Sequence, residues 1–424
     1  MTRRCNCPGV FECIYNGSGV IIGKKHFLLV ENAARHLIVA GLFLYLGALY
    51  FVDTNRQNTI FYLSVALPGL LLLGTSKDVL SVGFKEVRFV FVFLLYLVAS
   101  SLWSGMGIAN FFVALKYSFY LACLMLSIHL FVSRTPAGEQ AMTRFFVLIG
   151  FLASLVYLFF AFRSAFSGAN PLVGRYSLND LSGWGENNPI TSAVFFGLPV
   201  LAAWWRYPDE KLASRIGLLF LMVACMGVMF LTKSRGPFLS LAITLLFVTV
   251  YRRNWSDIVL WAVYGIVGLG FVLALDLHSV IADRVSAPDY RMEIWSQALG
   301  LISERLLWGY GYGSVVALSF GAGDLATHSH SSILEVLRVG GIAGGALFLA
   351  MVFLAVRKCL SGNAGAKFFL FWLIYGVMCL STNGRLLLSR PSVEWVAFWI
   401  PLFFMLIASG NSREPGRRDG AFST

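Results

Sequence analysis

The most regular feature of this sequence is a succession of long apolar runs separated by polar stretches. Most of the runs approach or exceed the roughly 17–25 residues with which a helix crosses a lipid bilayer. About twelve of them can be distinguished, near residues 36–52, 59–74, 89–104, 110–133, 143–162, 189–205, 216–232, 237–251, 258–277, 340–356, 367–382 and 395–409. The pattern predicts an all-α, polytopic integral membrane protein of about 12 transmembrane helices.

Composition agrees with this prediction. The 424-residue chain is 58% hydrophobic and only 13% charged, whereas about a quarter of the residues of a soluble protein are charged. The first 25 residues are polar and lack a small-residue cleavage site after an apolar core, so we expect no cleavable signal peptide.

The distribution of the net charge of +12 predicts the orientation in the membrane. An even number of spans places both termini on one side, and most Lys and Arg residues lie in the terminal segments and the short loops of that side, such as Arg252–Arg253. Short loops rich in Lys and Arg stay in the cytoplasm. We therefore expect a cytoplasmic N-terminal segment (1–35), a single transmembrane domain (36–409) and a cytoplasmic tail (410–424). The basic residues would contact membrane lipids, and no nucleic-acid partner is expected.

Neither metal nor nucleotide chemistry is indicated. The pair Cys5 and Cys7 lacks the usual two-residue spacing of a zinc knuckle. The sequence before Lys24 resembles a nucleotide P-loop, but Ser18 stands where the first glycine is required and Lys25 where Ser or Thr is required. We therefore predict no metal and no cofactor, and a substrate that arrives already activated.

Two long polar loops, near residues 163–188 and 276–330, are predicted on the outer side. A structureless loop as long as the second would be unusual, so we expect it to be functional or partly folded. Residues 291–302 have the pattern of an amphipathic helix, in which Arg291 and Trp295 share a face. A stretch punctuated by glycines, residues 308–314, follows.

The short outer turn between two spans, residues 231–238, contains the elements of a phosphate site. Pro237 suits the first position of the next helix, and Gly236 allows the backbone to approach a ligand. Free N–H groups at the helix start, with Lys233 and Arg235 beside them, favour an anion. The alternative is a tight turn in which these two side chains touch lipid headgroups.

Arg175 and Arg291 stand in the two long outer loops. The planar guanidinium group of arginine suits the oxygens of a phosphate or diphosphate. Taken alone, each residue is best interpreted as a solvated charge. If both approach Arg235, the three would form an anion site that no single loop could build.

A pair of histidines, His328 and His330, precedes the apolar run at 340–356. A helix that starts at His330 would place Leu334, Leu337 and Gly341 on the face of that histidine. His330 has either a base role or a structural, capping role, since neutral imidazole accepts a proton. His328 is expected to be an exposed interfacial residue.

Two charged residues follow the histidines within the same run. Glu335 and Arg338 are three residues apart and could pair on a helix. A charge at the depth of Arg338 is costly in lipid, so it should face the protein interior or a wet cavity.

In this order the motifs resemble the O-antigen ligase and polymerase superfamily. The resemblance covers residues 180–345, and Ser331 departs from it because Asn often follows the histidine there. The matching elements are Ser234-Arg235-Gly236, Arg291 with Trp295, Gly309-x-Gly311, and His330-Ser-x-x-Leu334 with Gly341.

The resemblance implies a GT-C-like glycosyltransferase architecture with its site on the periplasmic face of the Gram-negative inner membrane. The donor would be an O-antigen carried on undecaprenyl diphosphate and the acceptor lipid A–core, which makes an O-antigen ligase the predicted function. His330 would be the catalytic base. Diphosphate binding would fall to Arg235, Arg291, Arg175 and Lys233, and supporting roles to His328, Arg338, Glu335 and Trp295.

Three other functions remain open. An O-antigen polymerase shares most of the same motifs, and a transferase that acts on protein usually carries a longer C-terminal region than this chain has. A transporter of polyprenyl-linked glycans would tend to show internal repeats and polar residues near the bilayer midplane. No repeat is evident, and Lys116 is the only basic residue well inside a predicted span.

Overall fold

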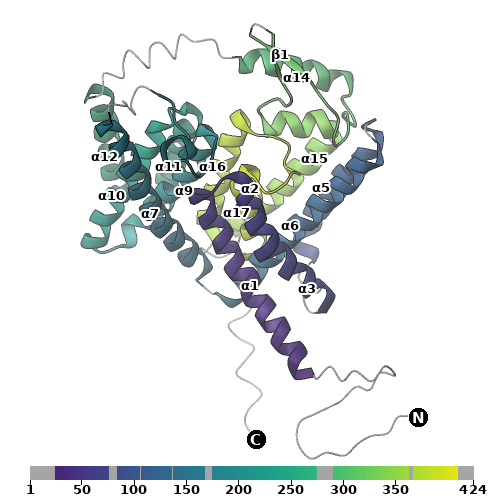
Figure 1. The fold of residues 1–424 in the computed structure, drawn as a ribbon, viewed down its shortest axis with the longest axis horizontal. Coiled ribbons are helices and arrows are strands. Elements are labelled where there is room, and N and C mark those ends of the chain that lie inside the picture. The colour runs from purple at the N-terminus through teal and green to yellow at the C-terminus, as the bar shows by residue number, and fades with distance from the viewer. Residues whose placement is uncertain are drawn as a thin grey trace, which may run out of the picture.

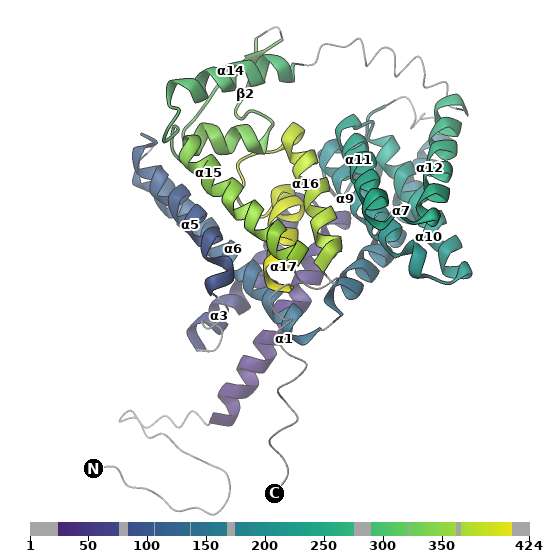
Figure 2. The same cartoon turned by 180° about the vertical axis from the view of Figure 1, so that it is seen from behind.

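The computed structural model describes residues 24–75, 84–105, 107–135, 137–167, 174–274, 290–321, 323–361 and 366–408. Within them the chain is mostly helical, and the helices pack into a bundle with α1 extending from its lower end and α14 covering its upper end (Figures 1 and 2). Most of the predicted cytoplasmic N-terminal segment, the predicted tail, Cys5 and Cys7, and residues 275–289 of the second outer loop lie outside the described residues.

Helices occupy the predicted apolar runs. Among the described residues, five helices are long and apolar enough to cross a membrane, namely α1 (from Glu31), α6, α7, α10 and α15, as expected for a membrane protein. The helices of the bundle are α1 (Lys24–Phe51), α2 (Thr54–Phe61), α3 (Leu67–Thr75), α5 (Phe84–Ser100), α6 (Ile108–Arg134), α7 (Gly138–Phe166), α9 (Pro189–Arg206), α10 (Leu212–Leu231), α11 (Arg235–Arg252), α12 (Trp255–Ala274), α15 (Ser332–Ser361), α16 (Lys367–Asn383) and α17 (Ile400–Ala408).

The second apolar run is a helix with an irregular middle. The π-helical segment η1 (Tyr62–Ala66) joins α2 to α3, and the side chain of Asp53 caps α2 by accepting from the backbone N–H groups of Asn55 and Arg56 at 3.0 and 3.2 Å. Gly41 of α1 packs directly against this segment, since a Cβ there would lie 2.2 Å from the carbonyl oxygen of Ser64. Small residues allow membrane helices to approach this closely.

The centre of the bundle is formed by α16 and α17. Helix α16 packs against α9, α11, α15 and α17, and its predicted run, 367–382, is almost completely covered by protein. The core contains large aromatic side chains that are almost fully buried, among them Trp204, Trp372, Trp395 and Trp399. A second π-helical segment, η5 (Trp395–Trp399), leads into α17.

Helix α15 is broken at Gly341, whose φ of 59° and ψ of −162° are not helical. The break leaves backbone N–H and carbonyl groups without partners within the helix. The loop that follows α14 forms hydrogen bonds with them. Tyr310 N donates to Arg338 O and Gly311 N to Val339 O, both at 2.9 Å, while Ile342 N donates to Leu306 O at 2.8 Å and Ala343 N to Leu307 O at 3.2 Å. Irregular backbone within a membrane protein is tolerated where other backbone groups pair with it.

The second outer loop contains a β-hairpin as well as the predicted helix. Helix α14 (Arg291–Glu304) covers the upper end of the bundle, and strands β1 (Leu318–Phe320) and β2 (Asp324–Ala326) pair antiparallel beside it (Figure 1). This agrees with the expectation that the second outer loop is partly folded, and the described chain outside this hairpin remains mostly helical. The hairpin turn contains Gly321 and Gly323, both with positive φ, and its strands bury Leu318 and Ala326 against Ile294 of α14.

Candidate functional site

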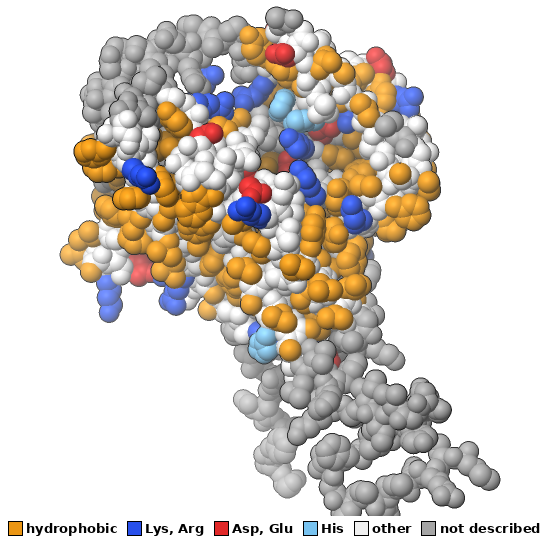
Figure 3. Space-filling model, viewed as in Figure 1, with side chains coloured by type: hydrophobic (Ala, Val, Ile, Leu, Met, Phe, Trp, Pro, Cys, Tyr) orange, Lys and Arg blue, Asp and Glu red, His pale blue; other side chains and the backbone are white. Residues whose placement is uncertain are grey.

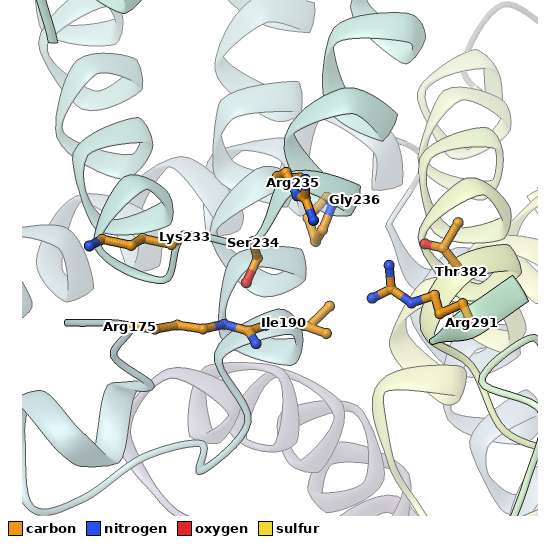
Figure 4. Close-up of a pocket in the computed structure, with 9 residues that line it drawn as sticks. Arg175, Ile190, Lys233, Ser234, Arg235, Gly236, Arg291 and Thr382 are labelled. Atoms are coloured by element: carbon orange, nitrogen blue, oxygen red, sulfur yellow. The ribbon is translucent and has the colours of Figure 1, made fainter. Parts of the chain in front are cut away.

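The basic residues predicted from three separate outer segments line one pocket of about 90 Å³. It lies where the starts of α9, α11 and α14 meet the end of α16 (Figure 4). Its lining residues are Arg175, Ile190, Lys233, Ser234, Arg235, Gly236, Pro237, Arg291 and Thr382. The three arginines therefore converge, which the sequence had left open.

One wall of the pocket is the turn between α10 and α11. Lys233 adopts a left-handed conformation with φ of 47°, and its N–H donates to Phe230 O at 2.9 Å. Helix α11 begins at Arg235 after Ser234. Pro237 thus occupies the third helical position and not the predicted first. Its lack of an N–H still costs nothing there, because the N–H groups of the first helical turn have no partner within the helix. The start of α11 contributes Gly236 and Pro237 to the pocket, where free N–H groups and the helix dipole favour an anion.

Arg175 is held on this turn although it lies far away in the sequence. Its Nε donates to Thr232 O at 3.3 Å, and the N–H of Tyr176 donates to Leu231 O at 3.2 Å. The loop then enters the short helix α8 (Leu178–Ser182) through a capping box formed by Ser177 and Asp180. The first long outer loop is therefore folded onto the bundle at this point.

The side chains differ in where they point. In Figure 4 Arg175 and Arg291 approach the pocket from opposite sides, Arg235 lies between them, and the amine of Lys233 points away. Lys233 therefore lines the pocket without directing its charge into it. Its left-handed backbone at the turn accounts for this different direction.

The histidines lie in a turn before α15 and not on the helix itself. His330 has a φ of 54°, and α15 begins at Ser332. Ser331 starts the helix, because its carbonyl accepts from Glu335 N at 2.9 Å and its Oγ from Leu334 N at 3.4 Å. The predicted helical face shared by His330 and Gly341 is therefore wrong, since the chain becomes helical only after His330 and breaks again at Gly341.

A buried ion pair supports this turn. Glu335 and Arg338, which are 2% and 5% exposed, pair at 2.9 Å as the sequence suggested, so Arg338 does face the protein interior. Glu335 Oε1 also accepts from Ser329 N at 2.8 Å. The indole of Trp295 donates to Ser329 O at 3.0 Å. Ser329, the residue between the two histidines, is therefore held at its N–H by Glu335 and at its carbonyl by Trp295.

The two imidazoles lie against each other, with ring centroids 4.2 Å apart. Burial is the main cause that lowers the pKa of His330, and the positive charges of Arg291 and Arg385 lower it further, against the opposing effect of Glu335. Burial, followed by the charge of His330, lowers the pKa of His328 to about 4. His328 is half-buried and not exposed as predicted, because it packs on its neighbour. Both rings are neutral at pH 7 and can accept a proton.

Comparison with known proteins agrees with these features. Residues 213–349 match the model of a family described as O-antigen ligase. Over this segment the chain is similar to O-antigen ligases. A relative named O-antigen ligase, from Pseudomonas aeruginosa, is 26% identical over 364 residues, which cover 84% of this chain and 86% of the relative. An O-antigen ligase transfers a glycan, so this similarity points to a glycosyl transfer activity.

The segment that matches the family model includes both the α10–α11 turn and the histidine turn. Arg175 and Arg385 lie outside it. Arg385 acts electrostatically on both histidines, whereas the sequence suggested only that basic and aromatic residues around Arg385 and Arg390 could bind an acceptor. The available signal was weak, namely two arginines in the polar stretch between the last two spans.

Among the described residues, no group of three or more His, Cys, Asp or Glu side chains could hold a metal ion. The polar groups gathered around the pocket are arginine side chains and helix N–H groups, which are donors suited to an anion. Figure 3 shows Lys and Arg side chains gathered around histidine side chains on the upper part of this face.

Proposed function

We propose that this protein transfers O-antigen polysaccharide from undecaprenyl diphosphate to a sugar hydroxyl of lipid A–core. The observation that carries the proposal is the arrangement of the arginine pocket and the histidine turn. Arg291 both lines the pocket and acts on His330, so a diphosphate in the pocket would lie next to a neutral base. The name of the Pseudomonas relative supports the same reaction.

The pocket would hold the diphosphate of the donor. Arg175, Arg235 and Arg291 can each present parallel N–H groups to phosphate oxygens. These donors would stabilise the negative charge that develops on the diphosphate as it leaves. Lys233 would contribute through its general positive charge, given the direction of its amine.

His330 would act as the general base. An acceptor hydroxyl oxygen attacks the anomeric carbon, the bond from this carbon to the diphosphate oxygen breaks, and the bonding electron pair leaves with undecaprenyl diphosphate. The hydroxyl proton passes to His330, which later releases it to water. One displacement of this kind inverts the anomeric centre, and it needs no ATP because the diphosphate is a good leaving group.

The remaining predicted residues would position this base. Glu335 and Trp295 hold Ser329, Arg338 completes the ion pair beneath it, and His328 packs on the ring of His330. Because these contacts already fix the position of His330, less conformational entropy is lost on substrate binding than with a mobile side chain.

The site is proposed to face the periplasm of the Gram-negative inner membrane, with both termini in the cytoplasm. The bias of Lys and Arg toward the opposite side supports this orientation. The pocket lies at the end of the bundle that α14 covers (Figure 1).

The experiment uses purified protein in detergent with an undecaprenyl-diphosphate-linked glycan and lipid A–core, with EDTA and without ATP. His330→Ala and Arg291→Ala are compared with the wild type by the size of the acceptor on a gel. The controls are His36→Ala and Arg56→Ala, which replace exposed residues of α1 and α2. We expect transfer in the wild type and controls, and a loss of about 10²-fold or more in both site variants.

Three results would change the proposal. Growth of the carrier-linked glycan in place of the acceptor would identify a polymerase. Full activity of His330→Ala would show that this histidine is not the base. Loss of wild-type activity in EDTA, restored by a divalent cation, would contradict a mechanism in which arginines alone stabilise the diphosphate.

A further inference from the structure

We propose that a strip of basic and tyrosine side chains, which runs from the histidine turn to α6, binds the phosphate groups of a phosphorylated glycolipid acceptor. The inference rests on the proposed function and names the part of the acceptor that this protein recognises. We call it the arginine–tyrosine strip, formed by Arg385, Arg390, Tyr62, Tyr120, Tyr117 and Lys116.

The strip begins at Arg385, which is near His330 but does not line the arginine pocket. The loop that carries Arg385 contacts the histidine turn directly, since the N–H of the preceding Gly384 donates to His330 O at 3.3 Å. Arg291 starts α14 and lines the pocket, whereas Arg385 follows α16 and is not among the pocket's lining residues. The base therefore has one cation on the donor side and a second cation that the donor pocket does not use.

The loop that carries Arg385 and Arg390 has a fixed backbone. Arg385 N donates to Glu394 Oε1 at 2.9 Å, and Arg385 O accepts from Ser332 Oγ at 2.5 Å. Near Arg390, the indole of Trp395 donates to Ser389 O at 3.1 Å. The side chains of both arginines nevertheless remain exposed. Exposed guanidinium groups on an ordered backbone are suited to bind a ligand at low entropic cost.

A series of close contacts continues the strip toward the membrane. Arg390 is near enough to the Tyr62 phenol for its charge to act on it. The rings of Tyr62 and Tyr120 lie 4.9 Å apart, and those of Tyr120 and Tyr117 lie 6.5 Å apart. The amine of Lys116 lies 4.9 Å from the centre of the Tyr117 ring. All three tyrosines are half-buried, so their phenol groups belong to a polar seam between α2–η1 and α6.

The position of Lys116 indicates an anionic ligand at this seam. It is exposed and lies eight residues after the start of α6, about 12 Å along the helix. A basic side chain at such a depth is costly unless a polar or anionic group accompanies it, and such residues commonly mark ligand paths. The Tyr117 ring already faces the Lys116 amine, and an anionic ligand at the seam would supply the complementary negative charge.

The shape of the strip identifies the kind of ligand. Figure 3 shows further Lys and Arg side chains below the histidines, and apolar side chains cover much of the lower part of this face. A molecule that matches this surface has a sugar at the histidines, phosphates along the strip, and acyl chains beside the apolar side chains. A phosphorylated glycolipid has this order of groups, whereas a free phosphate or a neutral sugar has only one of them.

The first test measures binding without turnover. His330→Ala protein is titrated with lipid A–core and with the same glycolipid after enzymatic removal of its phosphates, and Kd is measured in detergent. We expect Arg390→Ala and Lys116→Ala, each added to His330→Ala, to raise Kd for the phosphorylated form about tenfold, as the loss of one charge-assisted hydrogen bond would. Neither should change Kd for the dephosphorylated form. Arg390→Lys should recover part of the affinity, and Arg56→Ala should have no effect.

The second test measures kinetics with the active protein. We expect Arg390→Ala to raise KM for the phosphorylated acceptor about tenfold, with KM for the donor and kcat unchanged. Equal effects on both acceptor forms, or displacement of the acceptor by phosphatidylglycerol at equal concentration, would overturn the inference and show a structural role or a general lipid site. Binding through the strip without any transfer would uphold the inference while contradicting the proposed function.

Discussion

At the scale of single residues, the left-handed turn at His330 is the feature on which the proposed chemistry depends. The backbone places two half-buried imidazoles against each other, and the charges of Arg291 and Arg385 act on His330. Burial and both positive charges disfavour the protonated form, so His330 is neutral at lower pH than an ordinary histidine. A base of this kind is ready to accept a proton throughout the neutral range.

The pH dependence of transfer should report this lowered pKa. The acid limb of kcat/KM is expected to lie below the ordinary histidine pKa of 6.5, because His330 must be neutral to act. Arg385→Gln removes a charge that lowers this pKa, so the pKa rises and the acid limb moves to higher pH. The measurement is kcat/KM between pH 4 and 8, with Arg56→Gln as the control. An acid limb that moves to lower pH in Arg385→Gln would contradict the assignment.

The Glu335–Arg338 pair should contribute strongly to stability. Glu335→Ala leaves Arg338, which is 5% exposed, without its carboxylate partner, and a loss of about 3–5 kcal/mol is expected. Adding Arg338→Ala should restore part of this loss, because no unpaired charge then stays buried. Unfolding in denaturant, in detergent, measures the effect. Glu210→Ala, which breaks the more exposed pair with Arg206, should cost about 1 kcal/mol or less.

At the scale of elements, the break in α15 joins the glycine-rich loop to the helix that follows the histidine turn. The sequence indicated that Gly309, Gly311 and Gly341 matter, but not that they meet. A Cβ at Gly309 would lie 2.4 Å from Val339 O, and one at Gly341 would lie 2.4 Å from Leu307 O. The two backbones therefore pack in direct contact, and this contact sets the direction in which α15 leaves the site.

Gly341→Ala should disrupt this contact. The added Cβ would both clash with Leu307 O and require an L-residue to adopt a φ of 59°, which together should cost about 2 kcal/mol or more. Gly300→Ala is the matched control, because it lies within α14 with nothing within 4 Å of the new Cβ, and it should stabilise by about 0.5–1 kcal/mol. Thermal unfolding of both variants in detergent tests the difference. Equal stability of the two variants would show that the loop and helix are not packed as described.

At the scale of the whole molecule, the candidate site exists only because distant parts of the chain meet at one end of the bundle. Arg175, Arg235 and Arg291 come from three loops, and Arg385 follows the next-to-last span. The segments that carry these arginines meet because α9, α11, α15 and α16 pack against one another.

The predicted orientation can be tested at the two ends of this bundle. Ser303 and Ser214 are exposed at the end of α14 and near the start of α10. Ser303→Cys should react with a membrane-impermeant thiol reagent supplied to the periplasm, and Ser214→Cys only after the inner membrane is opened. The wild type gives the background, and its described cysteines, Cys123, Cys225, Cys359 and Cys379, are buried. The reverse labelling pattern would place the site in the cytoplasm.

Several properties could be predicted from the sequence alone. Long apolar runs can bury their backbone polar groups in a membrane only as helices, so the positions of the helices follow from hydropathy. The amphipathic pattern of 291–302 and the three-residue spacing of Glu335 and Arg338 are local, and both predictions agree with the structure. Individual anion-binding residues could also be recognised, because guanidinium chemistry belongs to the residue itself.

Other properties were decided only by the tertiary structure, because they depend on contacts between residues distant in sequence. The convergence of the arginines, the charge of Arg385 beside His330 and the direction of the Lys233 amine are of this kind. The same holds for the break at Gly341, whose unpaired backbone groups are satisfied by a loop some thirty residues earlier. The histidine turn is non-helical for the same reason, since Trp295 and Gly384 hold its backbone groups from outside. Local periodicity contains no information about partners that only folding supplies.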